Sequence, residues 1–146
     1  MIRFPLVVAL VLGAVSCAGP GAARGVTTGN APPSVAKPNG PYIPNGEADG
    51  SSGKLVVSMT DQMRFTPNSM ARVKTGQTIE IAVKNTGVTI HNVIAPALGV
   101  EKAIRVDPGK TGPVKLTAPS AVGTYQFWCN EPGHAEAGMI GQIIVE

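Results

Sequence analysis

Three potential metal ligands, evenly spaced in one short segment, constrain this chain more than any other feature of its sequence. Cys129, His134 and Met139 follow the pattern Cys-x4-His-x4-Met, directly after a strand-like run and among glycine and proline residues. A loop of this length can fold back so that the three side chains converge. The chain contains only one other histidine, His91. We therefore expect the fold to bring His91 to the loop as a fourth ligand.

One thiolate, two imidazoles and one thioether form an unusual set of donors. The two sulfur ligands are soft, which favours copper over magnesium, calcium or manganese. Zinc accepts cysteine and histidine but rarely a methionine thioether. Two histidines and one cysteine with a weakly bound methionine are the known ligands of blue-copper electron-transfer sites. Alone, a methionine often fills a gap in a core and a lone cysteine is often a small buried hydrophobic residue. Their coincidence in one loop favours a site for one copper ion.

The pattern of the remaining chain predicts one all-β domain over residues 54–146. Charged residues make up only 14% of the chain, while its 18 glycines and 13 prolines suit a fold with many turns. Residues 78–84 alternate, so that Ile79, Ile81 and Val83 should share a buried face. Further strands are expected at 55–59, 69–74 (an edge strand), 88–94, 114–116, 124–129 and 139–145. Short strands separated by turns predict a Greek-key β-sandwich.

The sequence also predicts one turn, leaves two alternatives for one segment, and indicates the orientation of one strand. Residues 65–68 are expected to form a turn, and residues 100–104 fit either one helical turn or irregular chain. In the strand at 124–129, the period of two places Tyr125, Phe127 and Cys129 on the core face and Trp128 on the opposite face. Tyr125 fits either a tyrosine corner or simple core packing.

The N-terminal part of the chain predicts export. Residues 1–16 combine Arg3 with a short apolar run, which is typical of a signal peptide. The small residue before Cys17 resembles the lipobox of bacterial lipoproteins, so we expect lipid on Cys17 to anchor the protein to the outer face of a bacterial membrane. Cleavage near Ala18 or Ala23 is the alternative, and it would leave the protein periplasmic or extracellular. Residues 17–53 are rich in glycine and proline and predict a disordered, flexible tether.

Several motifs together resemble the cupredoxin, or blue-copper, family, and most closely its plastocyanin and auracyanin branch. They are the run Gly123–Cys129, the pair Gly133-His134, the run Ala137–Gly141 and the upstream pair His91-Asn92. The resemblance covers residues 54–146, and the length of the loop between Cys129 and His134 is more similar to auracyanin. It implies a β-sandwich with one copper ion held at one end by His91, Cys129, His134 and Met139. It also implies that Asn92 ties the His91 strand to the ligand loop by hydrogen bonds.

The resemblance implies a mononuclear one-electron carrier that works between redox protein partners, and it does not imply an enzyme. Copper oxidases and reductases of related architecture need a further copper site, but both histidines are already used. A binuclear copper centre needs a second cysteine where Gly133 stands. The alternative is an extracytoplasmic copper storage or delivery protein, for which Met59, Met63 and Met70 could be cited. A net charge of +3 without a basic cluster gives no indication of nucleic-acid binding.

The surroundings of His134 indicate where such partners would dock. Small and apolar neighbours should leave one edge of the His134 ring exposed within a flat patch; they are Pro132, Gly133, Ala135, Ala137 and Gly138. Glu131 and Glu136 would form an acidic rim around this patch. Trp128, bonded directly to Cys129 and facing away from the core, offers a second route for the electron. The sequence does not identify the electron donor or acceptor.

Overall fold

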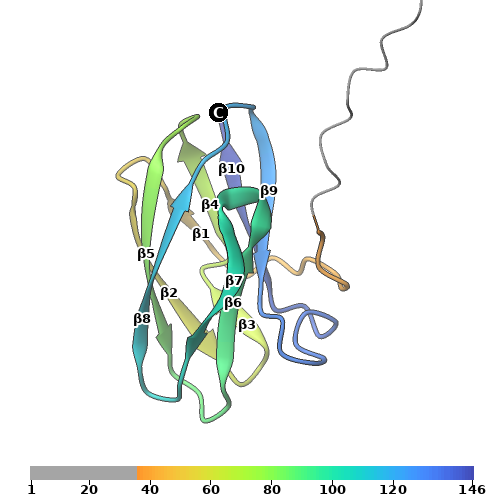
Figure 1. The fold of residues 1–146 in the computed structure, drawn as a ribbon. Coiled ribbons are helices and arrows are strands. Elements are labelled where there is room, and N and C mark those ends of the chain that lie inside the picture. Colours follow the sequence, from red (N-terminus) through yellow and green to blue (C-terminus); the bar gives the residue numbers. More distant parts are fainter. Residues whose placement is uncertain (1–35) are drawn as a thin grey trace, which may run out of the picture. The chain divides into compact units, whose positions relative to one another are not determined.

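The computed structural model describes residues 36–146, which form two β-sheets packed face to face (Figure 1). Ten strands and one short 3₁₀ turn, η1, make up this part of the chain. Their bounds are β1 Glu47–Asp49, β2 Lys54–Thr60, β3 Arg64–Thr66, β4 Ser69–Val73, β5 Thr78–Asn85, β6 His91–Ala95, η1 Pro96–Leu98, β7 Val100–Val106, β8 Thr111–Thr117, β9 Gly123–Trp128 and β10 Ile140–Val145. The predicted all-β sandwich is confirmed.

The two sheets contain both parallel and antiparallel pairs. One sheet has six strands in the order β1-β4-β10-β9-β6-β7, and the other has four in the order β3-β2-β5-β8. The parallel pairs are β1 with β4, β4 with β10, and β2 with β5. The pairing of β9 with both β10 and β6 is antiparallel. The strands that precede or contain the predicted ligands therefore lie next to one another in the larger sheet.

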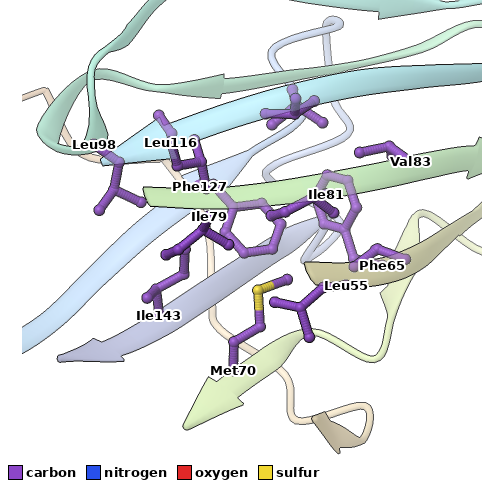
Figure 2. Packing of buried hydrophobic residues seen from close by; sticks show 14 of the residues in the cluster. Leu55, Phe65, Met70, Ile79, Ile81, Val83, Leu98, Leu116, Phe127 and Ile143 are labelled. Carbon is purple, nitrogen blue, oxygen red and sulfur yellow. The ribbon is translucent and has the colours of Figure 1, made fainter. Parts of the chain in front are cut away.

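The core lies between the two sheets and follows the alternation of the strands (Figure 2). In β5, Ile79, Ile81 and Val83 are buried, as their spacing predicts. The rings of Phe65 and Phe127 pack edge to face with their centroids 5.0 Å apart. Such a pair is worth about 0.5–1.5 kcal/mol beyond the area that it buries. The pair connects β3 of one sheet to β9 of the other. Phe127 lies near the end of β9, two residues before Cys129.

Three local predictions are wrong because pairing between distant segments overrides the local pattern. Residues 100–104, for which a helical turn or irregular chain was expected, lie in β7, which pairs antiparallel with β6. The turn expected at residues 65–68 begins with the last two residues of β3, which pairs with the end of β2. The expected edge strand at residues 69–74 is β4, an interior strand between β1 and β10.

The predicted tether ends earlier than residue 53. Residues 47–49 form β1, which pairs parallel with β4, although the sequence analysis assigned them to a disordered segment. We call residues 40–46, which lead into β1, the N-terminal strap. A strand of three residues is too short for an alternating pattern, and its Glu-Ala-Asp sequence carries no apolar run, so composition alone could not reveal it.

The strap is fastened to the domain by one buried asparagine. The Asn68 side chain, which is completely buried, accepts a hydrogen bond from the Asn45 backbone N–H at 2.6 Å. Its amide group donates to the carbonyl oxygens of Ile43 at 2.8 Å and Ile140 at 3.0 Å. Asn68 therefore joins the strap to the first residue of β10, immediately after Met139.

The predicted signal peptide, Cys17 and the tether up to residue 35 lie outside the described residues. Within residues 36–146, no helix is long and apolar enough to cross a membrane.

Candidate metal centre

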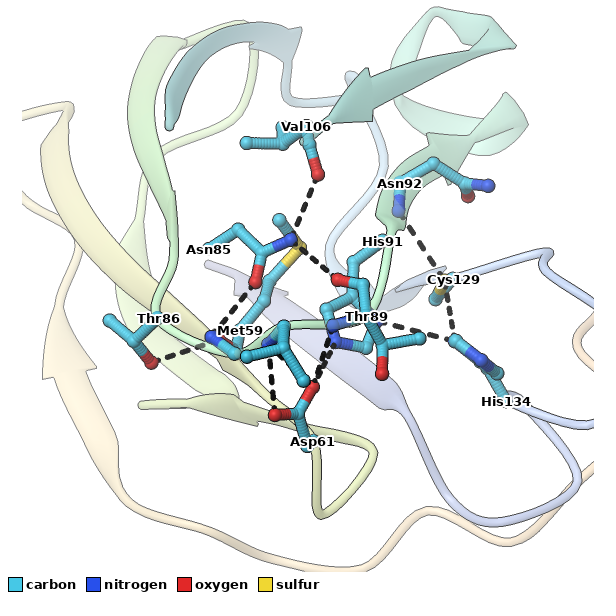
Figure 3. Close-up of polar contacts among 12 residues, drawn as sticks. Met59, Asp61, Asn85, Thr86, Thr89, His91, Asn92, Val106, Cys129 and His134 are labelled. Carbon is cyan, nitrogen blue, oxygen red and sulfur yellow. Dashed lines mark hydrogen bonds and ion pairs between the residues drawn. The ribbon is translucent and has the colours of Figure 1, made fainter. Parts of the chain in front are cut away.

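Three of the four predicted ligands converge at one end of the sandwich (Figure 3). His91 begins β6, Cys129 directly follows β9, and His134 lies in the loop between β9 and β10. One potential ligand atom from each residue lies within 4.8 Å of the other two. The Nδ1 atom of His134 is 3.2 Å from Nδ1 of His91 and 3.3 Å from Sγ of Cys129. The two imidazoles thus direct the same ring nitrogen, Nδ1, toward each other, and that of His134 also faces the thiol.

The ligand loop, residues 129–139, is closed by its own backbone hydrogen bonds. The Cys129 N–H donates to the Met139 carbonyl at 3.1 Å, and the Met139 N–H donates to the His134 carbonyl at 2.9 Å. Gly133 and Gly138 have φ angles of 82° and 97°, a left-handed region that glycine adopts without steric cost. These two glycines let the chain reverse on either side of His134, so the loop returns to β10.

Met139 is completely buried and packs in the main core cluster. Its backbone is bonded to both Cys129 and His134 through the two hydrogen bonds just described. The Met139 backbone therefore lies beside Cys129 and His134. The role of its sulfur as a weak fourth ligand stays a prediction.

Asn92 joins the His91 strand to the ligand loop. Its side-chain oxygen accepts a hydrogen bond from the Asn130 N–H at 2.9 Å, and its amide group donates to the Glu131 carboxylate at 2.8 Å. Its backbone N–H points at Cys129 Sγ, 3.4 Å away. The buried Asn92 thus holds the start of the loop with its side chain and directs its own backbone N–H at the Cys129 sulfur.

The electrostatics of the centre suit a bound cation. Burial, and then the neighbouring His134, lower the pKa of His91, so its imidazole stays neutral with a nitrogen free to bind a metal. Burial raises the pKa of the Cys129 thiol, while backbone N–H groups of Asn92 and Glu131 act in the opposite direction. A buried thiolate therefore needs a cation beside it. The soft sulfur and two imidazoles that converge here fit one copper ion.

On the outer side of the ligand loop, the predicted orientation of Trp128 is confirmed, but the predicted exposure of Ala135 and Gly138 is wrong. Trp128 faces away from the main core, but only 8% of it is exposed. Trp128 forms a separate cluster with Ala135 and Ile140, and Tyr42 of the strap packs against this cluster. Ala135 and Gly138, both expected in the exposed patch, are buried, and Ala135 is only 6% exposed. The strap crosses so closely that a side chain on Gly40 would meet the Ala135 carbonyl.

The other predicted neighbours of His134 divide into two groups. Pro132, Gly133, Glu136 and Ala137 are exposed, and His134 itself is half-buried. Glu131 is half-buried and accepts a hydrogen bond from Asn92, so it is not a free part of an acidic rim.

The Tyr125 hydroxyl donates to the Ala121 carbonyl at 2.8 Å, which is the hydrogen bond of a tyrosine corner.

Two further residues, which lie in the β2–β3 turn and in β3, reach the centre without any signal in the local sequence. Asp61 places Oδ1 3.9 Å from Nε2 of His91. The Arg64 guanidinium donates to the carbonyl of Ala137 in the ligand loop at 2.6 Å. Both contacts join residues far apart in the sequence, and no local pattern indicates them.

Comparison with known proteins agrees with this geometry. Residues 42–145 match the family model of the cupredoxin-like domain. The copper-resistant cuproprotein CopI of Rubrivivax gelatinosus is 29% identical over 123 residues, which are 72% of this chain and 73% of that protein. The dithionite-reduced auracyanin of Roseiflexus castenholzii is similar in structure, with a TM-score of 0.56 and 25% identity over 66% of this chain and 99% of its own.

The same fold occurs within larger proteins. The blue copper oxidase of Nitrosomonas europaea has a TM-score of 0.52 at 20% identity, and the match covers 64% of this chain but only 38% of the oxidase. The likeness to the oxidase therefore concerns the fold of one part of it.

Proposed function

Because this chain belongs to the cupredoxin-like family, we propose that it is a mononuclear blue-copper electron-transfer protein whose ligands are His91, Cys129, His134 and Met139. The observation that carries this proposal is the convergence of a buried thiol and two imidazoles within 4.8 Å. When bound, copper supplies a redox centre that accepts and releases one electron as Cu(II) and Cu(I).

The protein contributes a rigid, water-excluding frame for that centre. His91 and Cys129 are completely buried, and hydrogen bonds within the ligand loop hold His134 and Met139 relative to them. The N–H of Asn92 donates toward the sulfur, and such hydrogen bonds tune the potential of a metal site. A frame that holds its ligands in this way requires little rearrangement when one electron is gained or lost.

The test of this function is reversible redox cycling with the metal retained. We expect the copper-loaded protein to pass through repeated cycles of dithionite reduction and ferricyanide oxidation with a Cu(I) chelator present, and to keep its copper. Loss of the copper to the chelator in the first cycle would contradict an electron carrier, because a carrier must hold both oxidation states.

Copper storage or delivery is the second candidate function. The similarity to CopI, whose name associates that protein with copper resistance, favours it. Burial of the ligands opposes it, since a delivery site must expose its metal to a recipient. The same cycling experiment separates the two functions, because a delivery protein should release Cu(I) to the chelator.

We also propose that the protein is not an enzyme. Both histidines of the chain lie in the one centre. A second copper site of the kind found in copper oxidases would need histidines that this chain does not contain.

The role of Met139 is tested by its replacement with leucine. We expect Met139→Leu to keep copper bound, to raise the reduction potential and to change the free energy of unfolding by less than about 1.5 kcal/mol, because leucine conserves the volume but lacks the thioether. Met70→Leu, in the core at β4, is the matched control and should leave the potential unchanged. Equal potentials in the two variants would show that the Met139 sulfur is not a ligand.

We propose that the electron enters and leaves through the half-exposed edge of His134, because the strap covers Trp128. Pro132→Glu, at an exposed position beside His134, should slow transfer to the physiological partner at least several-fold while leaving colour and potential nearly unchanged. Pro113→Glu, at an exposed position of β8, is the matched control. Stopped-flow transfer rates decide the question: a wild-type rate in Pro132→Glu together with a slow Trp128→Leu would assign the route to Trp128.

We propose that the protein is exported and held at the outer face of a bacterial membrane by lipid on Cys17, which the adjacent apolar run supports. In that setting its partners would be redox proteins near the same membrane. A mass spectrum of the protein extracted from membranes should show an acylated N-terminal Cys17, and a different, unmodified N-terminus would contradict the anchor.

A further inference from the structure

Within residues 36–146, the outward nitrogen of His91 has no hydrogen-bond partner. Nδ1 of this ring faces Nδ1 of His134, but Nε2 forms no hydrogen bond with the residues that the structure describes, although the side chain is completely buried. A buried N–H without an acceptor has lost its hydrogen bond to water without compensation, which is unfavourable. The Asp61 carboxylate is the acidic group that faces this nitrogen, with Oδ1 3.9 Å from Nε2 (Figure 3). This gap is too short to hold a bridging water, and a movement of about 1 Å would close it to a hydrogen bond.

The position of the Asp61 carboxylate is fixed by the segment that leads into β6. It accepts hydrogen bonds from the Val88 N–H at 2.9 and 3.1 Å and from the Thr89 N–H at 3.0 Å. These two donors hold the carboxylate in its ionised form and lower its pKa. The carboxylate is therefore a charged hydrogen-bond acceptor held next to His91.

Gly87 leaves the space that this carboxylate occupies. A Cβ atom at residue 87 would run into the Asp61 carboxylate. The φ angle of Gly87 lies outside the left-handed region, so its backbone conformation alone does not require glycine. Glycine is needed at this position because the Asp61 carboxylate occupies the space that a side chain would take.

We propose that Asp61 is a positioning residue of the copper centre: it accepts the Nε2–H of His91, fixes the tautomer that leaves Nδ1 free, and places a negative charge on the outer side of the His91 ring. This inference rests on the proposed function. A histidine ligand usually donates its other ring N–H to such an acceptor, and loss of the acceptor typically weakens metal binding 10–100-fold. The second carboxylate that acts on His91 is that of Glu131, which Asn92 holds within the ligand loop.

The negative charge has a predictable effect on the reduction potential. It stabilises the doubly charged Cu(II) more than the singly charged Cu(I), which lowers the potential. We expect Asp61→Asn to raise the potential and to weaken Cu(II) binding at least about tenfold. Asparagine keeps an oxygen that can accept from Val88 and Thr89, so the loop should stay folded.

The matched control is Asp49→Asn. Asp49 also accepts a backbone hydrogen bond, from Ser51, and also carries a lowered pKa. Asp49 lies before the start of β2 and Asp61 lies after its end. The control therefore removes an equal charge far from the centre. Potential and Cu(II) affinity should match the wild type. If Asp61→Asn lowers only the thermal stability, and its potential equals that of the control, Asp61 merely supports the loop and the inference is wrong.

Gly87→Ala provides an independent variant that retains the charge. The added methyl group should push the Asp61 carboxylate away from His91, so the potential should move in the same direction as in Asp61→Asn but by less. An unchanged potential in Gly87→Ala would contradict a role that depends on the position of Asp61, even if Asp61→Asn failed to fold.

These outcomes are distinct from failure of the proposed function. If the wild type holds copper through reversible cycles while the Asp61 and Gly87 variants share its potential and Cu(II) affinity, only the inference about Asp61 is wrong. If the wild type itself does not cycle, the proposed function is wrong.

Discussion

Replacing Cys129 with alanine should abolish the intense visible absorption of the copper-loaded protein. The colour of a blue-copper site arises from charge transfer between the thiolate and Cu(II), and Cys129 is the sole thiol in the cluster of potential ligands. The expected effect is complete loss of the band, because neither the imidazoles nor the thioether can replace a thiolate in this transition.

The control for this variant is the other cysteine of the chain. Cys17→Ala should retain the full absorption, since Cys17 belongs to the predicted anchor rather than to the centre. Far-UV circular dichroism should show the same strand content in both variants. A Cys129→Ala protein that keeps the band would show that the sulfur ligand has been assigned wrongly.

Replacing Asn68 with alanine should lower the free energy of unfolding by about 3–5 kcal/mol. The side chain satisfies the Asn45 N–H and the carbonyl oxygens of Ile43 and Ile140. Each buried backbone group left without a partner costs about 1–3 kcal/mol, and partial entry of water reduces the sum. The strap should also loosen and expose Trp128, which a red shift of its fluorescence would report.

Asn130→Ala is the matched control for this loss of stability. Asn130 is exposed, and only its backbone N–H is used in the contact with Asn92. Its replacement should change the free energy of unfolding by no more than about 0.5 kcal/mol. Urea unfolding of the two variants measures the difference, and equal stabilities would show that Asn68 does not hold the strap in solution.

Much of the fold could be predicted from the sequence because most strands carry their own signal. The alternation in residues 78–84 indicated β5 and its buried face, and the strand before Cys129 appeared with the correct inward residues. β7 could not be recognised in this way. Its residues are mostly exposed, and its strand structure follows from pairing with β6, a contact that the local sequence does not show.

The residues of the candidate site also differ in whether the local sequence indicates them. The ligands Cys129 and His134 lie in one loop, so their spacing revealed them, and His91 followed because it is the only other histidine. Asp61 approaches His91 from a turn thirty residues earlier, and only the paired strands bring it there. The strap was missed for the same reason, so Ala135 was expected to be exposed, whereas Tyr42 and Gly40 of the strap lie against it.

The visible absorption spectrum of the wild-type protein during titration with Cu(II) tests the central proposal most directly. The proposed centre predicts an intense blue or green band that grows to one equivalent of copper, then stops, and disappears reversibly on reduction. A colourless one-to-one complex would contradict a centre in which Cys129, His91 and His134 bind the same copper ion.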